Sequence, residues 1–370
     1  MIHYKLANVV KEISERENNP STSIYERFVG LEHYVSGEVE IKKYGSTANL
    51  NSAMKVFRSG DILVARRNVY LKRASVVFFD GLTSGDSIVL RAKDKRIGKL
   101  LPFVLNTQEF WDYADKYSDG TMSKRLSPKV LLQYEFDLPD ENEQESLSDI
   151  LWGATDTKSA YVMLLNQTNE LEKSQFIEMF GDPIENDRGW KTEPLSKVAP
   201  ETVAEIPEAD KYWWLNLDMI EPNSGKLISK VWAPADEIGS STSTFDDTMV
   251  LYSKLRPYLN KVIVPDGCGY ATTELVAMRP DETKLNKFFL SSLLRGDEFV
   301  KYANGISGGA QMPRMPMKAL RQFPCILPPI ELQEEFVSFV ECCEKSKNEI
   351  VQSIENINAL VAAIIKQSIA

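Results

Sequence analysis

Hydrophobic residues near the end of the chain recur with the spacing of a helix. Between Leu327 and Ala370, after Pro328-Pro329 and with no later Gly or Pro, they follow the spacing of three and four that forms one stripe on a helix: Phe336, Phe339, Val340, Cys343, Ile350, Ile354, Ile357, Leu360, Val361 and Ile364. Proline suits the first turn of a helix, and nothing afterwards breaks it. The pattern predicts one long helix with an apolar stripe.

The same pattern occurs 189 positions earlier. The matched positions are Leu138-Pro139 with Leu327-Pro328, Gln144-Glu145 with Gln333-Glu334, Leu147 with Phe336, Ile150 with Phe339, Lys158 with Lys347, and Leu171 with Leu360. This predicts a second helix over Leu138–Phe180, weakened at Gly153 by about 1 kcal/mol relative to Ala. A lone helix with an apolar stripe needs a partner, so we expect the two helices to pair as an antiparallel coiled coil. Two unrelated amphipathic helices in ordinary cores are the alternative.

The repeat continues in the segments before the helices, at an offset of 188. Phe57–Lys72 aligns without a gap on Phe245–Asn260, and each copy reads as a short strand followed by a basic, aromatic turn. The whole chain therefore reads as two tandem copies, about 1–180 and 190–370, joined by the loop sequence G-D-P-I-E-N-D-R-G.

Each globular segment mixes strand and helix signals, so the predicted fold class is α+β with a curled sheet. The expected strands include Ile62–Ala65, Ser75–Phe79, Ser87–Arg91 and Met249–Tyr252, and the expected helical patches are Phe103–Tyr117 and Leu285–Tyr302. A polar loop precedes each long helix, over Ser118–Ser127 and Ala303–Arg314. We place domain boundaries at 1–137, 138–184, 185–326 and 327–370.

Composition narrows the class of protein. No run of eighteen apolar residues and no signal-peptide core is present, so we expect a cytoplasmic protein. Four cysteines without a C-x-x-C pair and only two histidines make neither a disulfide framework nor a zinc site. We expect reduced cysteines, no metal and no cofactor.

The net charge of −10 is unevenly distributed. Residues 1–137 carry +4, 138–184 carry −8, 185–326 carry −2 and 327–370 carry −4. The acidity lies on the predicted helices, while the globular segments are nearly neutral and can hold local basic patches that meet phosphates. The acidic helices are either a surface for a protein partner or ordinary solvated faces, because Glu is a good helix former.

Two stretches carry a family resemblance. Ser174–Ala199, S-Q-F-I-E-M-F-G-D-P-I-E-N-D-R-G-W-K-T-E-P-L-S-K-V-A, and the helix opening L-P-P-I-E-L-Q-E-E-F at Leu327–Phe336 resemble the specificity (S) subunit of Type I restriction-modification systems. The resemblance covers both halves of the chain. It departs from the family where the first helix opens with L-P-D-E-N-E-Q, so contacts of the two helices with partners need not be symmetric.

The resemblance implies two target-recognition domains, 1–137 and 185–326, held apart by two long antiparallel helices, one central and one C-terminal. Each domain would read one half of an asymmetric, bipartite sequence in double-stranded DNA. Two methyltransferase (M) subunits would methylate adenines in that sequence, and restriction (R) subunits would cut it when it is unmethylated.

Motifs for catalysis are missing from the sequence. It contains no N-P-P-Y or D-P-P-Y step for amino-methylation, no G-x-x-x-x-G-K-[ST], no G-x-S-x-G and no H-E-x-x-H. A nuclease cluster of Asp, Glu and Lys is not apparent either, so we expect a non-catalytic subunit. The alternative is a coiled-coil scaffold without DNA recognition, which would leave the duplicated basic, aromatic turns without a role.

The candidate site residues form two sets. The hypothesised DNA-facing residues are Arg66, Arg67, Tyr70, Lys72, Lys124 and Arg125 in the first copy and Lys254, Arg256, Tyr258, Lys261, Gln311 and Arg314 in the second. For any one of them, a solvated strand end is the alternative interpretation. The hypothesised partner-binding residues, on the acidic helix starts, are Glu143, Glu145, Glu334 and Glu335.

Overall fold

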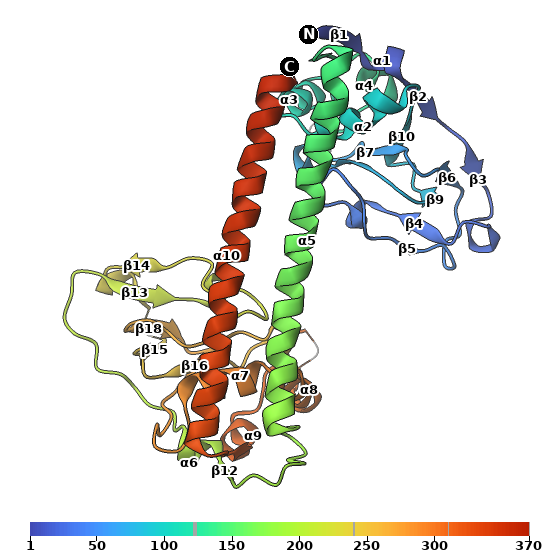
Figure 1. Cartoon of the computed structure of the whole chain (residues 1–370). Helices are drawn as coiled ribbons and strands as arrows, with labels where there is room; N and C mark the ends of the chain where they lie inside the picture. Colours follow the sequence, from blue (N-terminus) through green and yellow to red (C-terminus); the bar gives the residue numbers. More distant parts are fainter. Residues whose placement is uncertain (121–123, 240, 310, 370) are drawn as a thin grey trace. The chain divides into compact units, whose positions relative to one another are not determined.

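The computed structural model describes residues 1–120, 124–239, 241–309 and 311–369. The chain divides into two units, Met1–Tyr161 with Gln352–Ala370, and Val162–Val351. Each unit combines a globular part with a segment of two long helices, α5 (Glu141–Phe180) and α10 (Ile330–Ser368) (Figure 1). Within the described part of the chain, no helix is long and apolar enough to span a membrane.

Among its described residues, the first unit contains three sheets. A five-stranded sheet has the order β3-β6-β9-β4-β5, a four-stranded sheet has the order β2-β10-β7-β8, and β1 pairs with β11. The strands are β1 (Ile2–Lys5), β2 (Val10–Ile13), β3 (Arg16–Glu17), β4 (Arg27–Val29), β5 (Gly45–Ser46), β6 (Met54–Phe57), β7 (Ile62–Ala65), β8 (Ala74–Val76), β9 (Gly81–Thr83), β10 (Ser87–Ala92) and β11 (Glu135–Leu138). The helices are α1 (Leu6–Val9), α2 (Lys95–Val104), α3 (Gln108–Lys116) and α4 (Pro128–Leu131), with 3-10 turns η1 (Pro20–Thr22), η2 (Leu31–His33) and η3 (Val69–Leu71).

The described part of the second unit contains sheets with the orders β14-β13-β18-β15, β17-β16-β19 and β12-β20. Its strands are β12 (Thr192–Pro194), β13 (Tyr212–Leu215), β14 (Val231–Ala233), β15 (Thr242–Phe245), β16 (Val250–Ser253), β17 (Val262–Ile263), β18 (Gly269–Thr272), β19 (Leu275–Met278) and β20 (Pro324–Ile326). Its helices are α6 (Leu195–Val198), α7 (Lys287–Arg295), α8 (Asp297–Ile306) and α9 (Met317–Gln322), with 3-10 turns η4 (Leu217–Met219), η5 (Ala235–Glu237) and η6 (Pro257–Leu259).

The larger curled sheets of the two units agree in order and sense. In the first unit β9 is antiparallel to β6 and parallel to β4, which is antiparallel to β5. In the second unit β18 is antiparallel to β15 and parallel to β13, which is antiparallel to β14. The parallel pair at the centre needs a long connection, and each unit makes it through the strands and turns between the two partners.

The long helices enter the cores of both units. Leu147 and Leu151 of α5 are buried in the first core, with Ile369 at the end of α10. In the second unit, Phe176 and Phe180 of α5 pack on Phe336 of α10 with ring centroids 5.4 and 5.5 Å apart. These distances suit edge-to-face aromatic contact, so segments of α5 and α10 are fixed to each other inside the second unit.

A buried glutamine anchors the start of each long helix. Gln333 is fully buried, and its Nε2 donates to Pro328 O at 2.8 Å and to Lys284 O at 2.9 Å. The matched Gln144 donates to Pro139 O at 2.8 Å. A buried amide must be satisfied, so each glutamine holds the strand exit against the first helical turn. This gives a physical reason for the glutamine in the repeated helix opening.

Several expected elements are confirmed and others are corrected. The expected strands Ile62–Ala65 and Ser87–Arg91 correspond to β7 and β10. The first long helix begins at Glu141 rather than Leu138, because Leu138 pairs with Ile2 as the end of β11. Both helical patches are broken in two, at Thr107, which caps α3, and at Gly296, which ends α7.

The apolar stripe is less regular than expected. Phe336, Cys343 and Ile350 are buried, but the matched residues Leu171 and Leu360 are both exposed. A helix has 3.6 residues per turn, so positions repeated every seven residues rotate away from a fixed line of contact over several turns. Such positions are buried only where they still face packed side chains. Positions matched by the repeat can therefore both lie outside the contact.

One buried lysine joins the two long helices in the second unit. Lys347 of α10 is 4% exposed, and its Nζ lies 2.8 Å from Glu172 Oε1 on α5. It also pairs with Glu344 and donates to Asn169 Oδ1 at 3.2 Å. Burial raises the pKa of Glu172 against the opposing pull of Lys347. The matched Lys158 instead pairs with Glu38 Oε1 at 2.7 Å, and both of these groups are partly exposed.

Replacing Lys347 with Ala should lower the free energy of unfolding by about 3 kcal/mol, because the largely buried Glu172 would lose its counter-charge, whereas the more exposed Glu344 keeps Lys226. Lys158→Ala, the matched control, should cost less than about 1 kcal/mol. Urea unfolding of the full chain measures both. Equal losses for the two variants would contradict this account, and replacing Lys347, Glu172 and Glu344 together with Leu should restore most of the loss.

Candidate nucleic-acid interface

The basic, aromatic turn of the first unit is η3, between β7 and β8. Two residues in the left-handed conformation flank it, Asn68 with φ 54° and Lys72 with φ 46°. The turn presents Tyr70, which is 67% exposed. Backbone hydrogen bonds attach the polar loop before α4 to it: Asn68 N donates to Lys124 O at 3.0 Å, and Leu126 N donates to Arg66 O at 2.8 Å.

This attachment gathers the predicted cations of the first unit. Asp86 Oδ1 accepts from Arg67 Nε at 2.8 Å and from Arg125 Nη2 at 3.0 Å. Burial, followed by the charge of Arg125, lowers the pKa of Arg66. Two guanidinium groups thus pair with one carboxylate, and Arg66, whose Nε donates to Leu126 O, lies within electrostatic range of both Asp86 and Arg125.

The two lysines of the set lie at its edge. Lys124 Nζ pairs with Asp115 Oδ2 at 2.6 Å, and Lys72 Nζ donates to Gln108 Oε1 at 2.6 Å. Both side chains are therefore held by α3. Thr121, Met122 and Ser123 of the expected loop lie outside the described residues.

The second unit repeats the arrangement around η6. Arg256 with φ 50° and Asn260 with φ 49° flank the turn, and Tyr258 is 49% exposed. The loop before α9 is attached in the same way, since Arg256 N donates to Pro313 O at 2.7 Å and Met315 N donates to Lys254 O at 2.9 Å. Of the expected loop, Ala310 lies outside the described residues.

The structure brings most of the second set together. Lys254, Arg256, Tyr258 and Arg314 lie on the turn and the attached loop, where Arg314 Nη2 pairs with Glu274 Oε1 at 3.0 Å. Gln311 is exposed in the same loop, between Gly308 and Arg314, which bond to each other. Lys261 departs from the cluster, because its Nζ donates to Leu217 O at 2.6 Å.

The four predicted partner-binding glutamates are exposed in the first turns of the long helices. Glu143 and Glu145 lie on either side of the buried Gln144, and Glu334 and Glu335 follow the buried Gln333. Each pair belongs to a different unit. The structure therefore places each pair at the start of one long helix, and the two pairs in separate units.

Sequence reasoning missed a second basic, aromatic cluster on the curled sheet of each unit. The guanidinium of Arg27 lies 4.9 Å from the ring of Tyr44 and 5.2 Å from that of Phe79. In the second unit, Lys230 Nζ lies 4.1 Å from the ring of Trp213. These residues are far apart in sequence, so only strand register, which the sequence does not display, would have found them.

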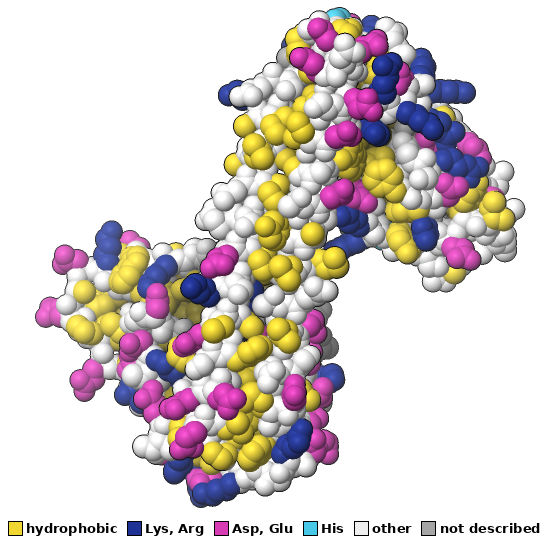
Figure 2. Space-filling view, viewed as in Figure 1, with side chains coloured by type: hydrophobic (Ala, Val, Ile, Leu, Met, Phe, Trp, Pro, Cys, Tyr) yellow, Lys and Arg dark blue, Asp and Glu magenta, His cyan; other side chains and the backbone are white. Residues whose placement is uncertain are grey.

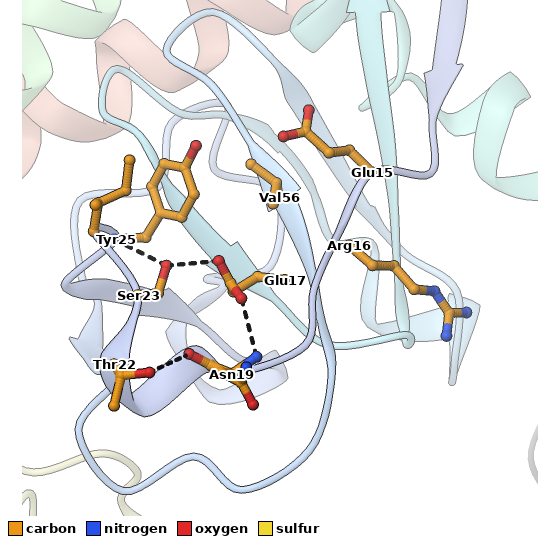
Figure 3. A pocket seen from close by; sticks show the side chains of 9 residues that line it. Glu15, Arg16, Glu17, Asn19, Thr22, Ser23, Tyr25 and Val56 are labelled. Atoms are coloured by element: carbon orange, nitrogen blue, oxygen red, sulfur yellow. Dashed lines mark hydrogen bonds between the residues drawn. The ribbon is translucent and has the colours of Figure 1, made fainter.

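A hollow of about 460 Å³ lies beside the curled sheet of the first unit (Figure 3). Glu15, Arg16 and Glu17 line it with Tyr25, and Glu17 already accepts hydrogen bonds from Asn19 N at 3.0 Å and Ser23 Oγ at 3.1 Å. With two carboxylates and one guanidinium, this wall is unsuited to an anion. Among the described residues, no group of three or more His, Cys, Asp or Glu could hold a metal ion.

Comparison with known proteins supports the expected resemblance. The Type I restriction enzyme EcoDI specificity subunit of Escherichia coli is 22% identical over 191 residues, 43% of this chain. That alignment covers 42% of the relative, so the match spans less than half of the relative's length. No family model matches the chain.

Solved structures agree over nearly the whole chain. A chain from a structure on complex assembly and conformational transition of the type I R-M system has a TM-score of 0.57 at 18% identity, covering 99% of this chain and 96% of its own. The Type-I restriction-modification S subunit from M. genitalium has a TM-score of 0.58 at 12% identity, covering 99% and 95%. The resemblance to Type I specificity subunits is confirmed, and the solved structures share the fold.

Each turn has a basic residue at a left-handed position where the other unit has Asn: Lys72 matches Asn260, and Arg256 matches Asn68. Each basic residue can therefore be replaced by the Asn that the other unit carries at the matched position. Lys72→Asn and Arg256→Asn should each raise the free energy of unfolding by about 0.5–1 kcal/mol, because Asn tolerates the left-handed conformation better. Each should also weaken binding to duplex DNA and lower the salt slope by about one unit if the lost cation meets a phosphate. Thermal unfolding and fluorescence anisotropy at several salt concentrations measure the two effects.

Asn68→Gly is the control for this pair, because it keeps the backbone permissive and changes no charge. It should leave the salt slope unchanged. A gain in stability with unaltered DNA binding in both Asn variants would remove Lys72 and Arg256 from the interface.

Proposed function

We propose that the chain is the DNA-recognition subunit of a Type I restriction-modification complex. The observation that carries the proposal is the η3 and η6 pair: each unit presents an exposed tyrosine in a turn flanked by left-handed residues, with a basic loop attached to it. Aromatic and guanidinium groups supply stacking and phosphate or base-edge contacts to nucleic acid. Conformational strain retained at basic residues points to function rather than stability.

The two units are two copies of one recognition module, 1–137 and 185–326 in their globular parts. The shared strand order of the curled sheets and the matched turns support the duplication. The turns differ in chemistry, since Asn68 stands where the second copy has Arg256. Two modules with different side chains read different bases, so the target is bipartite and asymmetric.

The chain supplies recognition, and its partners supply the chemistry. Methyltransferase subunits methylate adenine in the target and restriction subunits cut it, in keeping with the missing catalytic motifs and the confirmed resemblance. The proposal needs no cofactor bound to this chain. A scaffold without DNA recognition is the second candidate, but it gives no reason for strained basic residues at both turns.

The long helices pair antiparallel and set the distance between the half-sites. Contacts of Lys347 with Glu172 and of Phe336 with Phe176 support the pairing. A helix rises about 1.5 Å per residue, so α5 with its 40 residues is roughly 60 Å long. That exceeds one turn of duplex, about 34 Å, so a spacer that is measured but not read separates the half-sites.

The free faces of the long helices take the methyltransferase subunits. Hydrophobic side chains lie over these helices (Figure 2), and α5 exposes Val162, Met163, Leu164, Leu171 and Ile177 within the second unit. Exposed apolar residues on a helix, bordered by acidic ones, suit an amphipathic partner with basic flanks. The glutamates at the helix starts add the charge that would orient such a partner.

Reversing the charge of the four glutamates should abolish assembly with the methyltransferase subunits while DNA contacts of the globular parts survive. The variant carries Lys at Glu143, Glu145, Glu334 and Glu335. Pull-down of methyltransferase subunits from a co-expressing host measures assembly. A matched control carries the same charge change at exposed acids of the second globular part, Glu205, Glu208, Asp210 and Glu282, and should assemble normally. Full assembly of the first variant would refute this surface.

The proposed function is tested by methylome sequencing of a host that expresses the chain with its methyltransferase subunits. We expect one motif with two unlike half-sites and a fixed unread spacer, absent when the chain is omitted. Gel shifts with duplexes carrying that motif, with and without the methyltransferase subunits, check that the sequence is read by the complex. A continuous motif, or methylation that does not depend on the chain, would overturn the proposal.

A further inference from the structure

A basic, aromatic pair occupies the same place in the curled sheets of both units, with its two members exchanged. Strand register establishes the match. Phe28 of β4 lies opposite Leu82 of β9 and Gly45 of β5, while Trp214 of β13 lies opposite Tyr270 of β18 and Val231 of β14. Leu82 and Tyr270 are 188 positions apart, the offset of the sequence repeat.

The residues one position before these matched residues are a cation and a ring in both units, but on exchanged strands. Arg27 precedes Phe28 and corresponds to Trp213, while Tyr44 precedes Gly45 and corresponds to Lys230. In the first unit the cation is on the inner strand and the ring on the edge. In the second unit the ring is on the inner strand and the cation on the edge. The contact itself is retained, at 4.9 Å in the first unit and 4.1 Å in the second.

We call this cation–ring contact, with the rings next to it, the corner of each curled sheet. The two corners differ in charge. Lys230 Nζ pairs with Asp266 Oδ1 at 2.8 Å, which neutralises it, and its ring partner Trp213 is buried. Arg27 is exposed, and no carboxylate among the described residues forms an ion pair with it. Tyr44 beside it is 49% exposed, and Phe79 closes the corner with its ring 5.2 Å from that of Tyr44.

Holding the corner together does not require a free guanidinium. Lys230 makes the same contact with a ring while Asp266 neutralises its charge. The contact therefore holds the corner together without a net positive charge and without the planar guanidinium group. A guanidinium that stacks on aromatic rings still has its N–H groups free to donate in the guanidinium plane. The rings also restrict the arginine rotamers, so less side-chain entropy is lost when the arginine binds a ligand. Arg67, Arg125 and Arg314, in contrast, already donate to carboxylates.

Resting on the proposed function, we propose that Arg27, positioned by Tyr44 and Phe79, is a specificity-determining residue that reads a guanine in the half-site recognised by the first unit. Guanine O6 and N7 are the acceptors that best fit an arginine fork. The corner of the second unit offers a neutralised lysine and an exposed Trp232, so it reads no guanine in this way. The corner thereby helps to make the target asymmetric.

The test uses the complex of the full chain with its methyltransferase subunits and a set of duplexes that change each base pair of the motif in turn. Arg27→Lys keeps the charge and loses the fork, whereas Arg27→Gln loses both. Both variants should lose roughly ten- to a hundred-fold of the discrimination at one guanine of the first half-site, and none in the second half-site. Arg16→Lys and Arg16→Gln, at an exposed arginine of the same sheet, are the matched controls and should keep the full profile.

The outcomes separate the possible roles. If Arg27→Lys keeps the profile and Arg27→Gln weakens binding to all duplexes with a smaller salt slope, Arg27 contacts a phosphate and the inference is overturned. Unchanged profiles in both variants would also overturn it, and a lowered melting temperature beside them would assign the contact to internal packing. Failure of the proposed function is distinct, because the wild-type complex itself would then have no bipartite motif.

Discussion

The arrangement of each unit depends on a buried side-chain amide at the start of a long helix. In the second unit Gln333 donates to Pro328 O and Lys284 O, and its Oε1 accepts from Asn286 N at 2.9 Å. Asn286 caps α7, so one amide fixes the direction of α10 and the start of α7 together. An unsatisfied buried amide would cost about 1–3 kcal/mol, which makes other directions of the helix unfavourable.

The fixed helix α7 in turn positions the candidate interface. At its far end Arg295 O accepts from Asn260 Nδ2 at 2.9 Å, and Asn260 is one of the left-handed residues that flank η6. The first unit reaches the corresponding turn differently, through Lys72 and Gln108 at the start of α3. In the second unit, a chain of contacts thus runs from the start of α10 through α7 to the turn η6. The strained turn persists because its surroundings determine its conformation.

Sequence reasoning succeeded where the determining signal is local or repeated. The long helices follow from apolar spacing and missing breakers, and the matched turns follow from the gapless alignment around Tyr70 and Tyr258. It failed where distant residues decide. Leu138 reads as a helix start but pairs with Ile2, more than one hundred positions away.

The candidate site was predictable to a similar degree. The alignment located Arg66 and Arg67 on the turn, but Asp86, which holds Arg67 and Arg125, lies on a connection before β10 and gave no signal of its own. The contact of Arg27 with Tyr44 depends on the register between β4 and β5. Register is set by packing across the sheet, so a single sequence does not display it.

If the chain recognises DNA as proposed, its net charge of −10 would weaken the long-range attraction to the duplex, and this would favour discrimination. Non-specific binding arises mostly from phosphate contacts, so an acidic chain whose arginines are partly held by Asp86 and Glu274 gains little from random duplex. A DNA phosphate must displace a carboxylate from those guanidinium groups. This displacement is favourable only where the DNA makes several short contacts at the same time. Under the proposed function, the ion pairs at the turns would therefore lower the affinity for the wrong sequence more than for the right one.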